Sequence, residues 1–229
     1  MKSNSYGRDY FEKIHKIDNP ERKQILKKDL EFLISKKSGI RKMLDVGCGL
    51  GEFLGFCDQR GMMSYGLEIS KFALSIAKKN TKAKLGQLDI SKEKWPYKSN
   101  FFDAVCAFDL LEHVTNSRFV INEVYRVLKK GGIFLVTTPN GDLERNRFLR
   151  FLLPYDPTHI NVQNENFWQS CFQRVGFRKF QSKGCLFFGF PPHPRIRQRL
   201  RIVGVKSYMG PIFFPFKDIC ATLYIYGYK

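Results

Sequence analysis

The chain has 229 residues, of which 43% are apolar and 26% charged, and its formal net charge is +18. This is the composition of an ordinary globular domain. No apolar run approaches the roughly 20 residues of a transmembrane helix, which argues against a membrane-spanning protein. The six cysteines form no C-x-x-C pair, which argues against both a zinc knuckle and a disulfide framework.

The first 40 residues are predicted to form a helical cap. Asn19–Ser35 has an amphipathic pattern with Pro20 in its first turn, which is typical of a helix start. The residues before it are polar and contain no secretory signal, so we expect a cytoplasmic protein that is at most peripheral to a membrane.

Five short apolar runs follow, and their length and polar boundaries are typical of buried strands. They comprise residues 43–46, 65–67, 84–88, 104–108 and 133–137. Helical patterns lie between them, at Ser70–Lys79 and at Ser117–Lys129, and Gly131-Gly132 is expected to stop the second helix. Because strands that alternate with helices need crossover connections, the sequence predicts a doubly wound α/β domain with a mostly parallel sheet.

The C-terminal part is predicted to continue this domain. Glu165–Val175 has a helical pattern stopped by Gly176, and the last two strands are expected within 177–188 and 221–228. Between them, residues 189–217 form a basic segment rich in Phe and Pro, which we interpret as an insertion. The chain is therefore predicted to be a single domain of residues 1–229.

Arginines alternate with other residues inside this insertion, at Arg195, Arg197, Arg199 and Arg201. On a strand they would share one face, and on a helix they would spread around it; a solvated surface loop is the alternative. Such a positive field attracts an anionic substrate or a membrane surface. The flanking phenylalanines favour a lipid-linked substrate over RNA, although aromatic side chains also stack on bases.

A glycine-rich segment, Leu44–Phe53, contains the end of the first predicted strand and the loop that follows it. In an open parallel sheet, ligands bind beyond the carboxyl ends of the strands, and Gly47, Gly49 and Gly51 would allow close approach of the backbone to a ligand. The spacing is G-x-G-x-G, and Asp45 stands two residues before the first glycine. An acidic residue here suits a cationic ligand, such as the amino acid end of a sulfonium cofactor.

Two further acidic residues follow the neighbouring strands. Glu68 ends the second predicted strand, where a carboxylate can accept hydrogen bonds from both ribose hydroxyls. Asp89 ends the third, where it can meet the amino group of an adenine while Ile90 packs on the ring. The three acidic residues therefore predict a site for an adenosine-bearing, cationic ligand.

Five segments resemble, in order, the successive motifs of class I S-adenosylmethionine-dependent methyltransferases. They are residues 44–53, 66–70, 88–90, 102–114 and 123–139. The resemblance is closest to the small-molecule branch that includes the ubiquinone-pathway O-methyltransferases. It implies a Rossmann-like, seven-stranded sheet with an antiparallel last strand and S-adenosylmethionine as the methyl donor. It also implies cofactor contacts at Cys48, Ile69 and Phe108.

Two histidines are candidates for taking a proton from the acceptor. His159 follows the fifth strand, near the expected acceptor mouth, and is the first candidate; His113 is the second. Asp109, Glu112 and His113 are spaced at i, i+3 and i+4. The ubiquinone O-methyltransferases have an acid-x-x-Glu-His pattern here that is associated with Mg²⁺. Because Leu-Glu-His-Val also occurs in relatives that use no metal, we expect no metal ion.

The sequence thus predicts in-line methyl transfer to a small-molecule, glycan or lipid-linked acceptor, at oxygen. A nucleic-acid methyltransferase is the alternative, which only the charge favours. Amino-directed base methyltransferases carry an Asn/Asp-Pro-Pro-Tyr/Phe motif after the fourth strand, where this chain has Phe108-Asp-Leu-Leu.

Overall fold

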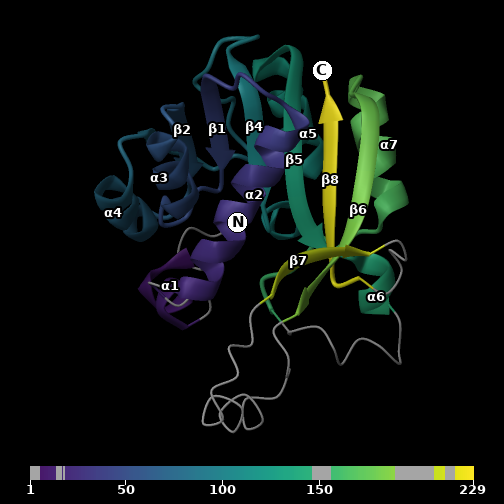
Figure 1. The fold of residues 1–229 in the computed structure, drawn as a ribbon, viewed down its shortest axis with the longest axis horizontal. Helices are drawn as coiled ribbons and strands as arrows, with labels where there is room; N and C mark the ends of the chain where they lie inside the picture. The colour runs from purple at the N-terminus through teal and green to yellow at the C-terminus, as the bar shows by residue number, and fades with distance from the viewer. Residues whose placement is uncertain (1–5, 14–16, 18, 146–155, 189–208, 215–219) are drawn as a thin grey trace, which may run out of the picture.

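The computed structural model describes residues 6–13, 17, 19–145, 156–188, 209–214 and 220–229. At its centre lies a sheet with the strand order β3-β2-β1-β4-β5-β8-β6-β7 (Figure 1). The strands are β1 Lys42–Val46, β2 Met63–Glu68, β3 Lys84–Gln87, β4 Phe102–Phe108, β5 Leu128–Pro139, β6 Arg178–Phe188, β7 Met209–Phe214 and β8 Thr222–Tyr228.

Strands β1 to β5 pair in parallel, whereas β8 runs antiparallel to both β5 and β6. The predicted doubly wound, mostly parallel fold with an antiparallel last strand is therefore confirmed. The seven strands of that prediction are present, and β7 adds an eighth at the edge, antiparallel to β6.

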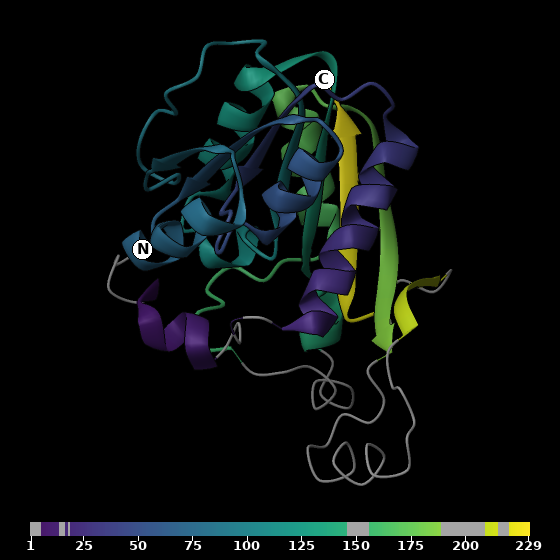
Figure 2. The same cartoon turned by 60° about the vertical axis from the view of Figure 1, so that its left-hand side comes forward.

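Helices cover both faces of the sheet. They are α1 Arg8–Lys13, α2 Pro20–Lys36, α3 Glu52–Gln59, α4 Lys71–Asn80, α5 Ser117–Val127, α6 Gly141–Arg145 and α7 Glu165–Val175, with a 3-10 turn, η2, at Leu111–His113. Helices α2 and α3 pack together on one face and α5 and α7 on the other (Figures 1 and 2).

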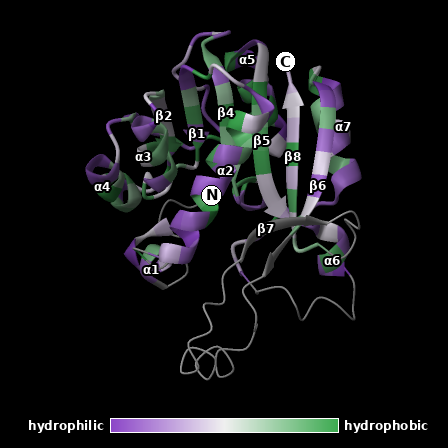
Figure 3. Cartoon of the chain, in the orientation of Figure 1, coloured by the Kyte–Doolittle hydropathy of each residue, from purple (hydrophilic) through white to green (hydrophobic). Residues whose placement is uncertain are grey.

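Alternation along the strands builds a core on each face. Leu44 and Val105 pack with the α5 and α7 side chains, whereas their neighbours Met43 and Ala104 pack with those of α2 and α3. The central strands are accordingly largely hydrophobic, while helices such as α4 show hydrophilic residues outwards (Figure 3).

The helix starts follow the expected capping chemistry. The Asn19 side chain accepts a hydrogen bond from the Glu21 amide at 3.0 Å, and the Ser70 hydroxyl accepts one from the Ala73 amide at 3.2 Å. Gly176, at a φ of 106°, ends α7 as predicted.

The predicted helix Ser117–Lys129 is too long. Helix α5 ends at Val127, because Leu128 pairs with Phe102 and begins β5. The glycines expected to stop the helix therefore lie inside a strand, where Gly131 has a φ of +72°.

Most of the predicted insertion, 189–217, including Arg195–Arg201, lies outside the described residues, and only 209–214 of it are seen, as β7. The organisation as one domain with an insertion stays a prediction. Among the helices that the structure describes, none is long and apolar enough to cross a membrane.

Candidate active site

A cavity opens beyond the carboxyl ends of β1, β2 and β4, with an empty volume of about 620 Å³ that includes its open mouth. Seven of the ten predicted cofactor residues line it: Gly47, Gly49, Glu68, Ile69, Asp89, Ile90 and Phe108. The sheet topology thus brings together side chains from segments far apart in the sequence.

The glycine loop between β1 and α3 needs backbone conformations that favour glycine. Gly47 has a φ of +73°, and a Cβ added to it would lie 2.6 Å from Leu110 Cδ1. Its amide donates to the Leu67 carbonyl at 2.7 Å, which fixes the turn against β2. The loop therefore passes close to the cavity as bare backbone.

Glu68, at the end of β2, is 7% exposed and held by three backbone amides. Its carboxylate accepts hydrogen bonds from Gly49 at 2.9 Å, Ile69 at 2.8 Å and Ser70 at 2.9 Å. Burial raises the pKa of Glu68, and these hydrogen bonds offset part of the increase. The side chain is preorganised at the cavity wall.

Asp89 and Ile90 follow β3 and form the next part of the wall. One Asp89 oxygen accepts from the Ser91 amide at 3.1 Å and hydroxyl at 2.7 Å, and the other lies 3.0 Å from Lys92 Nζ. Burial raises the pKa of Asp89, but the hydrogen bonds from Ser91 and Lys92 outweigh it, so the pKa is lowered. Asp89 is thus ionised at neutral pH.

Three predicted cofactor residues, Asp45, Cys48 and Gly51, do not line the cavity. Asp45 is 3% exposed, and burial raises its pKa well above the usual range while Arg22 opposes this. The Cys48 thiol packs under β2, since a Cβ on Gly66 would lie 2.7 Å from its Sγ. Cofactor contacts of Asp45, Cys48 and Gly51 therefore stay predictions.

The sequence did not reveal the N-terminal wall of the cavity. Tyr6 and Tyr10 line it with their ring centroids 4.9 Å apart, and Ser70 Oγ donates to the Tyr6 carbonyl at 2.6 Å. Burial raises the pKa of Tyr6 to about 12, so its phenol is neutral. Arg22, from α2, also lines the cavity, and its Nε lies 3.6 Å from Glu52 Oε2. The spacing of Tyr6 and Tyr10 is compatible with one side of a helix, but their position at the cavity depends on contacts with residues far away in the sequence, such as Ser70.

The two candidate histidines lie side by side, with ring centroids 4.8 Å apart. His113, in η2, is 5% exposed and lines the cavity, whereas His159 is not among the lining residues. Burial, with His159 nearby, lowers the pKa of His113 and favours its neutral form. The structure therefore places His113, the second candidate, at the cavity, and His159, the first candidate, outside its lining.

The possible metal ligands are arranged differently from the sequence pattern. Atoms of Glu112, His113 and His159 lie within 4.8 Å of one another, and Asp109 is outside this group. Glu112 is fully buried, and burial raises its pKa well above the usual range. That this site needs no metal stays a prediction.

A family model described as a methyltransferase domain matches residues 12–182. The chain belongs to this methyltransferase family. It is similar to a ubiquinone biosynthesis O-methyltransferase of Vibrio vulnificus (29% identical, 60% of this chain, 58% of the relative). It also resembles a sterol 24-C-methyltransferase of Gibberella zeae (35% identical, 51% of this chain, 35% of the relative). The chain thus spans less than two thirds of either relative.

Solved methyltransferases share the fold. One from Archaeoglobus fulgidus superposes with a TM-score of 0.68 at 19% identity, over 96% of this chain and 98% of that one. A Haemonchus contortus phosphoethanolamine N-methyltransferase, in complex with S-adenosyl-L-methionine, superposes with a TM-score of 0.67 at 16% identity, over 97% of this chain and 59% of that one. The prediction of an S-adenosylmethionine-dependent methyltransferase of Rossmann-like fold is confirmed at the level of the family.

Proposed function

We propose that the chain transfers the methyl group of S-adenosylmethionine to a hydroxyl oxygen of a small-molecule, glycan or lipid-linked acceptor. One observation carries this proposal: Glu68 and Asp89 line the cavity on the β2 and β3 side of β1, and His113 lines it on the β4 side. A nucleoside-binding wall and a proton acceptor thus share one cavity.

The donor is assigned to the wall formed by the loops after β1, β2 and β3. Glu68 would accept hydrogen bonds from the ribose hydroxyls, and Asp89 one from the adenine amino group with Ile90 against the ring. Arg22 beside the glycine loop suits the carboxylate of the methionyl end. When bound, the donor supplies a methyl group on a positively charged sulfur, and the protein contributes mainly its positioning.

The charges around the cavity favour a neutral reacting group on the acceptor. Glu68, Asp89 and Asp109 line it, and among the lining residues that the structure describes Arg22 is the one arginine or lysine. This balance suits a cationic donor, and the anionic acceptor that the basic segment favours stays a prediction. The predicted membrane contact through Arg195–Arg201 stays part of the proposal and rests on the sequence alone.

Binding and transfer are tested separately. Titration calorimetry with S-adenosylmethionine is expected to show one site per chain, and the absence of binding would refute the donor assignment. Labelled donor is then offered with fractionated small-molecule, lipid, polysaccharide and RNA extracts. We expect label in the small-molecule, lipid or polysaccharide fraction, whereas label in RNA would establish the nucleic-acid alternative.

A further inference from the structure

Asp156, Thr158 and His113 form a chain of hydrogen bonds that ends at the cavity. We infer that Asp156 and Thr158 are positioning residues that fix His113 in the tautomer whose Nε2 takes the acceptor proton. This inference rests on the proposed methyl transfer to oxygen and adds the residues that prepare its base. The sequence drew attention to this segment through His159 and gave Asp156 and Thr158 no role.

The contacts of His113 Nδ1 determine its tautomer. Nδ1 lies 3.1 Å from the Thr158 carbonyl oxygen, which can only accept a hydrogen bond. Nδ1 must therefore carry the proton. The Thr158 hydroxyl oxygen, 3.0 Å from Nδ1, is a second acceptor, because its own proton points to Asp156.

Asp156 holds Thr158 in this orientation. Its Oδ1 accepts from the Thr158 hydroxyl at 2.6 Å and from the Thr158 amide at 2.8 Å. Burial raises the pKa of Asp156, but the two hydrogen bonds from Thr158 outweigh it and the pKa is lowered. The ionised carboxylate is only an acceptor, so the direction of every hydrogen bond in the chain is fixed.

With Nδ1 protonated, Nε2 keeps its lone pair on a ring that lines the cavity. The charged and titratable groups around the ring are Glu112, His159, Asp156, Asp109 and Tyr6. His159 lowers the pKa of His113, and the two aspartates raise it less than burial and His159 lower it. The ring is therefore a neutral base that becomes cationic beside acidic neighbours.

The proton transfer balances without another reactant. As the acceptor oxygen forms its bond to the methyl carbon, the carbon–sulfur bond breaks and its electron pair stays on sulfur. The acceptor proton moves to His113 Nε2, and Asp156 stabilises the imidazolium that forms, as an aspartate does for the histidine of a hydrolytic triad.

His159 is a poorer base in this arrangement. Its Nε2 lies 3.8 Å from Asp156 Oδ2, and its ring is not among those that line the cavity. It contacts the same carboxylate from the other side, so its replacement by Gln is expected to leave the His113 tautomer unchanged.

The tautomer is measured first, by nitrogen-15 NMR of the histidine-labelled chain without ligand, with His113→Gln used for assignment. We expect one tautomer in the parent, with the proton on Nδ1. Asp156→Asn and, more weakly, Thr158→Val are expected to give a mixture, and Thr158→Ser to restore the parent spectrum. Asp142→Asn, an exposed aspartate to asparagine change, is the matched control. An unchanged tautomer in Asp156→Asn would overturn the inference.

Single-turnover transfer of labelled methyl to the extract fractions is measured second. Asp156→Asn is expected to lower the rate about 10-fold or more with unchanged donor affinity, and His113→Gln about 100-fold. If the parent transfers label and Asp156→Asn matches its rate, the positioning role is wrong and the proposed function stands. If the parent labels no fraction, the proposed function fails together with the base role, whatever tautomer NMR shows.

Discussion

At the scale of single residues, Glu68 is the group whose placement owes most to the surrounding backbone. Three amides hold its two oxygens: Oε1 accepts from Ile69 and Ser70, and Oε2 accepts from Gly49 and keeps a lone pair for a ligand. Glu68→Ala is expected to weaken S-adenosylmethionine binding about 10- to 100-fold, since a hydrogen bond to a charged group is worth about 1.5–3 kcal/mol. Calorimetry measures the change.

Asp89→Ala is expected to have a smaller effect in the same titration, because Ser91 and Lys92 already occupy its oxygens. Glu31→Ala is the matched control, since Glu31 is an exposed carboxylate on α2 that does not line the cavity. Unchanged affinity in both Glu68→Ala and Asp89→Ala would contradict the ribose and adenine assignments.

A second residue, Asp29, makes stability depend on pH. It is 2% exposed, and its Oδ1 accepts from Tyr224 Oη at 2.6 Å, which joins α2 to β8. Burial raises the pKa of Asp29 to about 7. A raised pKa means that the folded state binds the proton more tightly, so this contribution to stability is full below pH 3.8 and is lost as pH rises to about 7.

Asp29→Asn removes that loss because an amide stays neutral. Relative to the parent, the Tm of the variant is expected to rise by about 3 °C or more between pH 5 and pH 8. Calorimetric melts across this range measure it, with Asp142→Asn as an exposed control. A Tm difference that does not vary with pH would show that Asp29 titrates normally.

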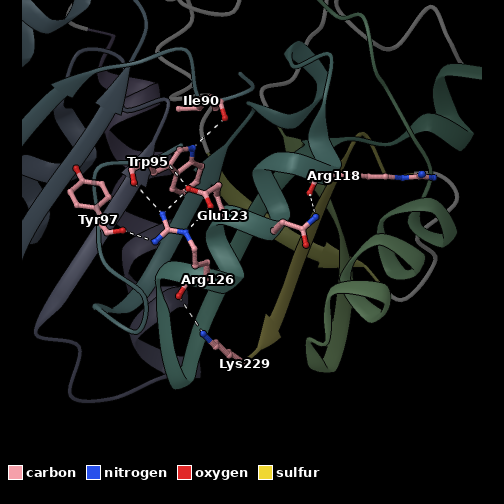
Figure 4. Close-up of polar contacts among 8 residues, drawn as sticks. Ile90, Trp95, Tyr97, Arg118, Glu123, Arg126 and Lys229 are labelled. Atoms are coloured by element: carbon pink, nitrogen blue, oxygen red, sulfur yellow. Dashed lines mark hydrogen bonds and ion pairs between the residues drawn. The ribbon is translucent and has the colours of Figure 1, made fainter. Parts of the chain in front are cut away.

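At the scale of elements, α5 holds the loop that carries Ile90. Arg126 donates to the Tyr97 carbonyl at 2.6 Å and the Trp95 carbonyl at 3.1 Å, and it pairs with Glu123 through Nε and Nη2, both at 2.7 Å (Figure 4). Glu123 accepts from the Trp95 amide at 2.8 Å, and the Trp95 indole donates to the Ile90 carbonyl at 3.2 Å. The helix thereby fixes one wall of the cavity.

Arg126→Ala is expected to lower the Tm by about 5 °C, because it leaves Glu123 and two carbonyls without their donor. Amide exchange over residues 90–97 should quicken, and donor affinity should fall. Arg118→Ala is the control, since Arg118 is on the same helix but points away from this network (Figure 4). If amide exchange over residues 90–97 is the same in Arg126→Ala as in the parent, the Arg126 network does not hold this loop.

Local patterns predicted most elements, and long-range contacts decided the rest. The apolar runs located β1, β2, β4 and β5 because these parallel strands are buried on both faces, whereas β3, at the edge of the sheet, has no buried residue. Helical periodicity ran past Val127 because Leu128 is equally apolar, and only its pairing with Phe102 makes it a strand. The loop acids marked one wall of the cavity, whereas Tyr6 and Arg22 reach it only through tertiary docking.

At the scale of the whole molecule, the net charge of +18 is not concentrated at the described cavity, whose lining carries more acidic than basic residues. The excess of positive charge therefore lies outside the cavity. A basic surface binds anionic membranes with about 1 kcal/mol per Lys or Arg near the headgroups. The arginines at 195, 197, 199 and 201 are the candidates from the sequence.

Changing these four arginines to Gln is expected to reduce partitioning onto anionic vesicles about 10-fold or more, and to leave neutral vesicles unaffected. The control changes Lys28, Lys78, Lys79 and Lys82 to Gln. These lysines are exposed, so the control loses the same total charge from other positions of the chain. Co-sedimentation at several salt concentrations separates a local site from general attraction, because screening weakens both but only a local site distinguishes the two variants. Equal partitioning of both variants would assign the attraction to net charge and remove the membrane contact of the arginine segment.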